Sequence, residues 1–126
     1  MKRRVLLVDD NMAVRSSLSM VLKDAGFDVE EACDGLDGLT KAKAQFFDAF
    51  VIDYKMPIMD GITLIKGLRE LTEYSHHAMN LLTTDVGSDF MAKSAELEDV
   101  HVLAKPIDHQ QLIELTSKQS LFRSTA

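Results

Sequence analysis

Residues 49–61 read AFVIDYKMPIMDG, and they give the clearest local indication of the fold. The first four residues are apolar throughout, as in a parallel strand that is covered on both faces of its sheet. The segment from Asp53 to Gly61 contains Pro57 and is predicted to be a loop. Asp53 is therefore expected where a buried strand ends and a loop begins.

The same alternation of an apolar run and an amphipathic stretch occurs five times along the chain. The apolar runs predict strands at residues 5–8, 27–32, 49–52, 79–83 and 100–104. Apolar residues at helical spacing predict helices over about 14–25, 36–43, 62–71, 90–97 and 108–116. Gly26 is expected to close the first helix, and Asp108 is expected to cap the last. Glu30 and Glu31 indicate that their strand lies at an edge of the sheet, and residues 121–126 are predicted to be a frayed tail.

Strands that are separated by helices need crossover connections, which produce a parallel sheet with helices on both faces. The predicted fold class is therefore α/β and doubly wound. A length of 126 residues suits one domain, and no internal repeat, linker or low-complexity tract divides the chain. We expect a single domain over residues 1–126.

The composition excludes several classes of protein. Lys and Arg number 14 against 20 Asp and Glu, a net charge of -6, and an acidic domain repels phosphate backbones, so direct nucleic-acid binding is not expected. No apolar run approaches the ~20 residues that span a bilayer, and the N-terminus does not resemble a signal peptide. The single cysteine, Cys33, has no partner for an internal disulfide, so the expected location is a reducing cytoplasm.

Ligands of doubly wound sheets bind at the carboxyl ends of the strands. The residues at these ends are Asp9, Asp10, Asp53, Thr83, Thr84 and Lys105. Three ionised carboxylates repel one another unless a cation lies between them, and oxygen ligands favour Mg²⁺ over Zn²⁺. An ammonium group and a hydroxyl can hold an anion beside that metal. The set of groups predicts phosphoryl transfer in which a carboxylate is the nucleophile and forms an acyl phosphate.

Each of these residues also has a simpler interpretation. Residues 9–11 precede a predicted helix and can be N-capping residues, and Asp53 can be a turn former. Lys105 before Pro106 can be a solvated side chain. These interpretations weaken because all the residues are expected on the same edge of the sheet. The four histidines lack the spacing of a metal site, and no glycine motif for nucleotide binding occurs.

Asp9 and Asp10, the stretch 53–61 and the pair Lys105 and Pro106 together resemble the receiver domain of bacterial response regulators. The resemblance extends from residue 3 to about residue 118. It implies the flavodoxin-like strand order 2-1-3-4-5. The core of the domain is accordingly expected at about 3–118.

The resemblance also implies how the phosphoryl group is accepted and held. Asp53 would be the phosphoacceptor and would take the group from a histidine kinase. Thr83 and Lys105 would hold the phosphoryl oxygens. Pro106 would follow a cis peptide bond that orients Lys105.

Mg²⁺ is the cofactor that the resemblance implies. Asp10 would bind the ion directly, and Asp9 would bind it largely through water. Asp53 and the main-chain carbonyl of Lys55 would supply further ligands.

The sequence departs from the family pattern near the predicted fifth strand. In the family, a Tyr or Phe on that strand follows the movement of the switch Thr, whereas Val102 stands at this position here. Thr84 stands where the family usually has a smaller residue, and Lys55 lies where members of the family vary. We expect Thr83, Thr84, Val102, Lys55 and Pro106 to tune the switch. The departure affects the usual output face, which is formed by the fourth helix, the fifth strand and the fifth helix.

The implied function is that of a phosphorylation-dependent switch in a two-component phosphorelay, and not of an enzyme that turns over an external substrate. Its expected partners are a sensor histidine kinase or a histidine phosphotransfer protein, and an unidentified downstream protein or output domain. Neither nucleic acid nor a membrane is expected to bind directly. Kinase recognition in the family involves mainly the first helix and the loop after the fifth strand. The candidate residues there are Met12, Arg15, Ser16 and Ile107.

Three alternatives stay open at this point. The chain can be a stand-alone receiver, or a fragment of a larger regulator that lacks its output domain. It can also be a pseudo-receiver that binds partners without phosphorylation, which the altered position 102 favours. A phosphatase or phosphotransferase with an aspartyl nucleophile is the third alternative, although haloacid-dehalogenase-like phosphatases need an acid-base Asp where Lys55 stands.

Overall fold

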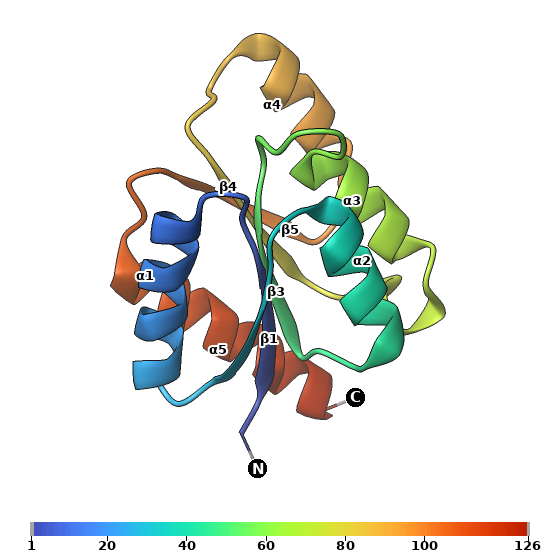
Figure 1. The fold of residues 1–126 in the computed structure, drawn as a ribbon. Coiled ribbons are helices and arrows are strands. Elements are labelled where there is room, and N and C mark those ends of the chain that lie inside the picture. Colours follow the sequence, from blue (N-terminus) through green and yellow to red (C-terminus); the bar gives the residue numbers. More distant parts are fainter. Residues whose placement is uncertain (1, 126) are drawn as a thin grey trace.

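The computed structural model describes residues 2–125, with side-chain surroundings as far as residue 118. Its centre is a parallel sheet of five strands in the order β2-β1-β3-β4-β5 (Figure 1). The strands are β1 (Arg4–Val8), β2 (Asp28–Ala32), β3 (Ala49–Asp53), β4 (Met79–Thr83) and β5 (Val100–Ala104). The predicted α/β doubly wound fold and its strand order 2-1-3-4-5 are confirmed.

Helices cover both faces of this sheet. One face carries α1 (Met12–Asp24) and α5 (His109–Thr125), and the other carries α2 (Gly35–Ala44) and α3 (Gly61–Arg69) (Figure 1). A short 3-10 helix, η1 (Thr72–Tyr74), lies between α3 and β4, and α4 (Ser88–Ala95) stands at the top of the view in Figure 1. Within residues 2–125, no helix combines the length and the apolar character that a membrane crossing needs.

The central strands are buried because they are apolar on both faces. All residues of β3 and β4 are buried. Alternate residues of β1 contribute to the two separate cores, since Leu6 and Val8 pack with the cluster that contains Leu64 of α3, whereas Val5 and Leu7 pack with the cluster that contains Leu22 of α1. Complete burial of such a side chain stabilises the fold by about 1.5–3 kcal/mol. The sequence pattern of continuous apolar runs therefore has its cause in two-sided burial.

The edge strands are less apolar, as the sequence predicted for β2. Glu30 and Glu31 of β2 are only partly buried, and β2 pairs with β1 alone. Each glutamate has a basic partner, because Lys41 Nζ lies 3.8 Å from Glu30 Oε1 and Arg15 Nε lies 3.1 Å from Glu31 Oε1. Charged residues on an edge strand discourage pairing with a further strand.

Short polar side chains define where the helices begin and end. Asn11 Oδ1 accepts the N–H of Val14 at 3.0 Å at the start of α1. The predicted cap at Asp108 is confirmed, because its Oδ1 accepts the N–H of Gln111 at 3.0 Å. Gly26 follows the end of α1 with φ 101°, a left-handed conformation that glycine adopts without steric cost.

Helix α5 is longer than the sequence predicted. Residues 121–126 were expected to form a frayed tail, but α5 continues to Thr125. No glycine or proline occurs between His109 and Thr125, so the stretch contains none of the residues that usually stop a helix. Ala126 lies outside the described residues.

Candidate functional site

The side chains of Asp9, Asp10 and Asp53 meet at the carboxyl edge of the sheet. β1 and β3 are parallel neighbours with Val8 opposite Ile52, so the residues that follow leave the sheet at the same edge. One carboxylate oxygen from each of the three aspartates lies within 4.8 Å of the other two. Asp9 is 0% exposed and Asp53 is 5% exposed, whereas Asp10 is open to solvent. The structure thus brings together the three carboxylates that the sequence placed at this edge.

Lys105 reaches the same cluster from the end of β5. Its Nζ lies 2.7 Å from Asp53 Oδ1 and 3.7 Å from Asp9 Oδ2. The main-chain N–H of Lys105 donates to Thr83 O at 2.8 Å, which ties the end of β5 to the end of β4. The peptide bond between Lys105 and Pro106 is cis, as expected. A fixed ammonium group therefore stands against the buried carboxylate of Asp53.

Burial and neighbouring charge shift the pKa values of both partners. Burial raises the pKa of the Asp53 carboxyl, and the charges of Asp9 and Asp10 add to this effect, while Lys105 opposes it. Partial burial alone would lower the pKa of Lys105. Its hydrogen bond to Asp53 and the charges of Asp53 and Asp9 outweigh that effect and raise it. Asp53 is therefore a carboxylate whose negative charge Lys105 only partly compensates.

The chain around Asp9 holds its carboxylate in one orientation. The N–H of Asp9 donates to Ala32 O at 3.2 Å, and Asp9 Oδ1 accepts the N–H of Asn11 at 2.9 Å. Arg15 Nη1 donates to Asp9 O at 2.7 Å. Asp9 Oδ2 is buried and has no hydrogen-bond partner among the described residues, and its nearest cation, Lys105 Nζ, lies 3.7 Å away. Because a buried anionic oxygen without a hydrogen bond is unfavourable, this atom is suited to a cation or to a water molecule bound to one.

The composition of the cluster fits Mg²⁺. Its three side chains offer only carboxylate oxygens, and no histidine or cysteine joins them in the part of the chain that the structure describes. Mg²⁺ prefers oxygen ligands, usually takes one or two carboxylates and keeps several water molecules. The exposed Asp10 leaves one side of the cluster open for that water. A zinc site, by contrast, would be expected to include nitrogen or sulfur ligands.

Thr83 ends β4, and its hydroxyl is bound to the turn that follows. Thr83 Oγ1 accepts the N–H of Asp85 at 2.8 Å and donates to Asp85 O at 3.3 Å. The side chain is buried. Since a hydroxyl has two acceptor positions and one hydrogen, Thr83 can keep the first bond and turn its hydrogen toward an anion.

The remaining positions that the sequence singled out for tuning lie at the surface. Lys55, Thr84 and Pro106 are exposed. Val102 on β5 is 44% exposed. A small and partly exposed side chain packs too loosely to follow Thr83 as a buried aromatic ring would.

Tyr54, the residue after Asp53, makes a contact that the sequence analysis did not identify. Its ring centroid lies 4.6 Å from that of Phe90, with the ring planes at 56°. Phe90 is the buried residue of α4, and Tyr54 is itself buried. The N–H of Tyr54 also donates to Leu82 O at 2.8 Å. An aromatic residue beside Asp53 was visible in the sequence, but its partner on a distant helix was not.

The residues predicted to contact a kinase divide into two groups. Met12 is 70% exposed, Ser16 is exposed, and Ile107 lines an apolar cleft of about 560 Å³ between α1 and the segment after β5. Arg15 differs, because its side chain is only 14% exposed and is bound to Asp9 and Glu31. Arg15 is therefore engaged within the protein and is not part of the open surface.

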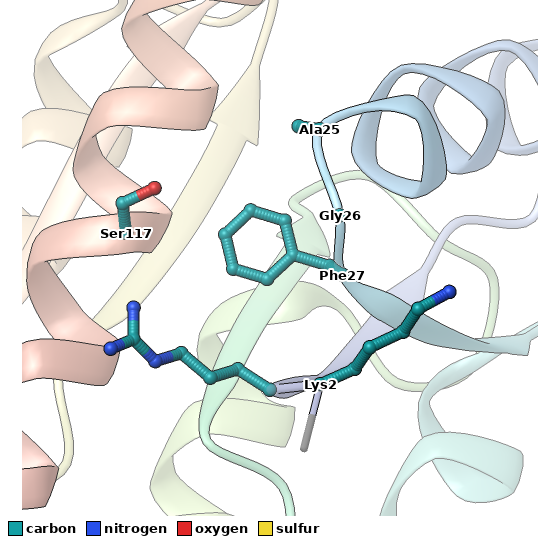
Figure 2. A pocket seen from close by; sticks show the side chains of 6 residues that line it. Lys2, Ala25, Gly26, Phe27 and Ser117 are labelled. Atoms are coloured by element: carbon teal, nitrogen blue, oxygen red, sulfur yellow. The ribbon is translucent and has the colours of Figure 1, made fainter.

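A further pocket of about 500 Å³ lies at the amino ends of the strands, at the other end of the sheet from the acidic cluster. It is lined by Lys2, Arg3, Ala25, Gly26, Phe27 and Ser117. Figure 2 shows the ring of Phe27 facing Ser117 across this pocket. Arg3 precedes β1 and Phe27 precedes β2, so the pocket lies at the amino ends of the strands. None of these six lining residues is acidic, and we take the cluster of Asp9, Asp10 and Asp53 as the candidate functional site.

Comparison with known proteins agrees with this geometry. A family model described as the response regulator receiver domain matches residues 5–117. The chain belongs to this family. Among its relatives, the chemotaxis protein CheY of Treponema pallidum is 34% identical over 115 residues, which cover 88% of this chain and 78% of that protein. The family that the sequence resembled is thus confirmed.

Solved receiver domains share the fold. The chemotaxis protein CheY4 of Vibrio cholerae superposes with a TM-score of 0.86 at 30% identity, covering 94% of this chain and 98% of that one. The receiver domain of a Pseudomonas aeruginosa sensor histidine kinase has a TM-score of 0.86 at 22% identity, covers 95% of this chain and 98% of that one, and is described with a magnesium ion in its active-site cleft. Receiver domains are signalling domains of two-component phosphorelays, in which they interact with histidine kinases and downstream effectors.

Proposed function

We propose that this receiver domain accepts a phosphoryl group on Asp53 from the phosphohistidine of a sensor histidine kinase or a histidine phosphotransfer protein. The observation that supports it best is the buried Asp53 carboxylate, which lies 2.7 Å from Lys105 Nζ and shares one cluster with Asp9 and Asp10. A nucleophile, a fixed ammonium group and a cation site thus occupy one small volume. Phosphoryl transfer depends mainly on such positioning and on stabilisation of charge.

Asp53 supplies the attacking atom in this reaction. One of its carboxylate oxygens forms a bond to phosphorus while the bond between phosphorus and the donor's imidazole nitrogen breaks. The imidazole leaves with the bonding electron pair and takes up a proton, and Asp53 becomes an acyl phosphate. Lys105 is close enough to pair with the phosphoryl oxygens, and Thr83 can turn its hydroxyl hydrogen toward one of them.

Asp9, Asp10 and Asp53 are proposed to hold Mg²⁺, with water between Asp9 and the ion and the main-chain carbonyl of Lys55 as a further ligand. The oxygen-only cluster and the unsatisfied Asp9 Oδ2 support this assignment. A receiver domain of the same fold is described with magnesium in its active-site cleft. When bound, Mg²⁺ supplies positive charge that balances the carboxylates and the incoming phosphoryl oxygens.

The output of the switch is proposed to pass to α4 by two contacts. Thr83 is bonded to Asp85 in the segment that leads to α4, so a turn of the Thr83 hydroxyl toward a phosphoryl group alters that segment. Tyr54 connects the acceptor strand to Phe90 of α4. In the family, a Tyr or Phe on the fifth strand follows the movement of the switch Thr. Because position 102 is a partly exposed valine here, we propose that these two contacts transmit the change instead. Phosphorylation would shift the population between two arrangements of α4.

The pseudo-receiver alternative has one observation in its favour, the valine at position 102, whereas the meeting of Asp53 with Lys105 and with the other two aspartates supports acceptor chemistry. Lys55 stands where a haloacid-dehalogenase-like phosphatase needs an acid-base Asp, so hydrolysis of an external substrate has no comparable support. A cytoplasmic location stays a prediction from the sequence, as does a single domain with its core at about 3–118. A stand-alone receiver and the receiver part of a larger regulator are both compatible with the proposal.

Intact-protein mass spectrometry after incubation with acetyl phosphate tests the proposed function. We expect a gain of one phosphoryl group that requires Mg²⁺, is prevented by EDTA and maps to the peptide that contains Asp53. A gain that persists in EDTA would contradict the role of the metal. If neither acetyl phosphate modifies the protein nor beryllofluoride binds to it, the pseudo-receiver alternative replaces the proposal.

Replacing Lys55 by Ala is expected to speed the loss of the phosphoryl group by a few-fold, where a tenfold change corresponds to about 1.4 kcal/mol in the barrier. Lys55 is exposed two residues after Asp53, so its side chain can restrict the approach of water to the acyl phosphate. The measurement is the decay of phosphorylated protein after acetyl phosphate is removed. Lys66→Ala on the exposed face of α3 is the control, and equal decay of Lys55→Ala and wild type would overturn this expectation.

A further inference from the structure

Arg15 of α1 lies behind the acidic cluster and is bound from two sides. Its Nη1 donates to the main-chain oxygen of Asp9 at 2.7 Å, and its Nε lies 3.1 Å from Glu31 Oε1 on β2. The arginine side chain is 14% exposed and the glutamate side chain is 35% exposed. The planar guanidinium group thus joins α1, the end of β1 and the edge strand β2, which a single flexible ammonium group would do less well.

The carbonyl that Arg15 holds belongs to the peptide unit between Asp9 and Asp10. Two further polar groups of Asp9 are also hydrogen-bonded, since its N–H donates to Ala32 O and its Oδ1 accepts from Asn11. Rotation of this peptide unit would move both carboxylates, because one precedes it and the other follows it. Arg15 therefore restrains the part of the chain that aims Asp9 and Asp10 at Asp53.

We propose that Arg15 is a positioning residue for the metal site, which fixes the Asp9–Asp10 peptide so that both carboxylates can share one Mg²⁺ with Asp53. The inference rests on the proposed function, because it concerns the same metal. In this role Arg15 touches neither the ion nor the phosphoryl group. Partners of this kind, which orient the ligands of a metal, typically change metal affinity 10- to 100-fold when they are replaced.

Charge and positioning predict opposite effects of replacing Arg15 by Met. Arg15 is a cation beside a cation site, so the loss of its charge alone would strengthen Mg²⁺ binding. The loss of positioning would weaken it. Methionine keeps an unbranched apolar side chain in the space of the arginine stem, so the variant removes the charge and the hydrogen bonds with little change in packing.

Isothermal titration of the protein with Mg²⁺ tests the inference. We expect Arg15→Met to raise the Kd for Mg²⁺ by about tenfold or more. Arg15→Lys keeps the charge but cannot reproduce the fork, so an intermediate Kd is expected. Arg4→Met is the matched control, because Arg4 Nε of β1 pairs with Asp28 Oδ2 of β2 at 3.4 Å, at the amino ends of these strands. The Kd of this variant for Mg²⁺ should equal that of the wild type.

A second readout separates positioning from a direct catalytic role. With acetyl phosphate as donor, the Arg15→Met variant should be phosphorylated slowly at low Mg²⁺. Its rate of phosphorylation should approach the wild-type rate when Mg²⁺ saturates the site. An unchanged or lower Kd for Arg15→Met would overturn the inference while leaving the proposed function intact. If Arg15→Met does not fold, the charge-conserving Arg15→Lys decides alone, and a wild-type Kd for it overturns the inference. Absence of Mg²⁺ binding by the wild type would instead overturn the metal site of the proposed function.

Discussion

Replacing Asp53 by Asn is expected to abolish phosphorylation and, without Mg²⁺, to leave the protein at least as stable as the wild type. The amide has no ionised oxygen that can form an acyl phosphate. The stability follows from the pKa of Asp53, which burial raises although Lys105 opposes the shift. A raised carboxyl pKa means that folding disfavours the ionised form, and this cost is fully present above the raised pKa, so a neutral side chain removes it at neutral pH.

Intact-mass measurement with acetyl phosphate and Mg²⁺, together with thermal unfolding in EDTA, checks both parts of this expectation. Asp48→Asn is a suitable control, because Asp48 precedes the same strand and its Oδ2 accepts the N–H of Arg4 at 2.7 Å, away from the cluster. This control should phosphorylate like the wild type. A phosphoryl gain in Asp53→Asn would place the acceptor on another residue, and a lower Tm would show that the pair of Asp53 and Lys105 is a net source of stability.

Replacing Gly61 by Ala is expected to destabilise the fold by about 3 kcal/mol, at the upper end of the usual cost of overpacking. A Cβ atom on Gly61 would lie 2.4 Å from Asp53 O, 2.8 Å from Leu81 Cδ1 and 3.0 Å from Tyr54 Cα. Two of these are main-chain atoms, one in the last residue of β3 and one in the residue that follows it, and main-chain atoms cannot turn away as a side chain can. The start of α3 must therefore move away from β3, and the hydrogen bond from the Gly61 N–H to Tyr54 O, 2.8 Å long, is strained.

Thermal or urea unfolding measures this effect, and the corresponding fall in Tm is roughly 10 °C for a domain of this size. Gly67→Ala on the same helix is the matched control. Its Cβ would meet Leu39 at 3.8 Å, an ordinary contact, so the better helix propensity of alanine should raise stability by about 1 kcal/mol. Wild-type stability in Gly61→Ala would show that α3 can shift freely, and wild-type phosphorylation of it would show that Asp53 does not depend on this packing.

The sheet itself was predictable from local sequence. Runs such as residues 5–8 and 49–52 are apolar at every position because both faces of a central parallel strand are covered. Such a run can be recognised within its own segment, without knowledge of the rest of the chain. The order of the strands was not local information, and it came from the resemblance to the receiver family. The boundaries were less exact, since Asp53 is the last residue of β3 and α5 runs on to Thr125.

The site was predictable to the extent that sheet geometry determines it. Asp9, Asp10, Asp53 and Lys105 all stand at the carboxyl ends of strands, and parallel strands end on one edge, so their convergence follows once the strands are known. The orientation of Thr83 did not follow. Its hydroxyl bonds to Asp85 here, and that choice depends on the conformation of a turn, for which the residue types gave no signal.

The fold class and the acidic edge were predictable from the amino-acid sequence, because hydrophobic periodicity is a property of each segment. The family was predictable from the motif residues at the strand ends. Which distant side chains meet depends instead on tertiary packing. Arg15, which the sequence analysis assigned to a partner-binding surface, instead bonds to Asp9 within the protein. Phe90 of α4 packs against Tyr54. Helix α3 also begins so close to the end of β3 that only glycine fits at position 61. Such contacts depend on how complete helices and strands pack together, and the hydrophobic periodicity of one element does not specify the shape of the element that packs against it.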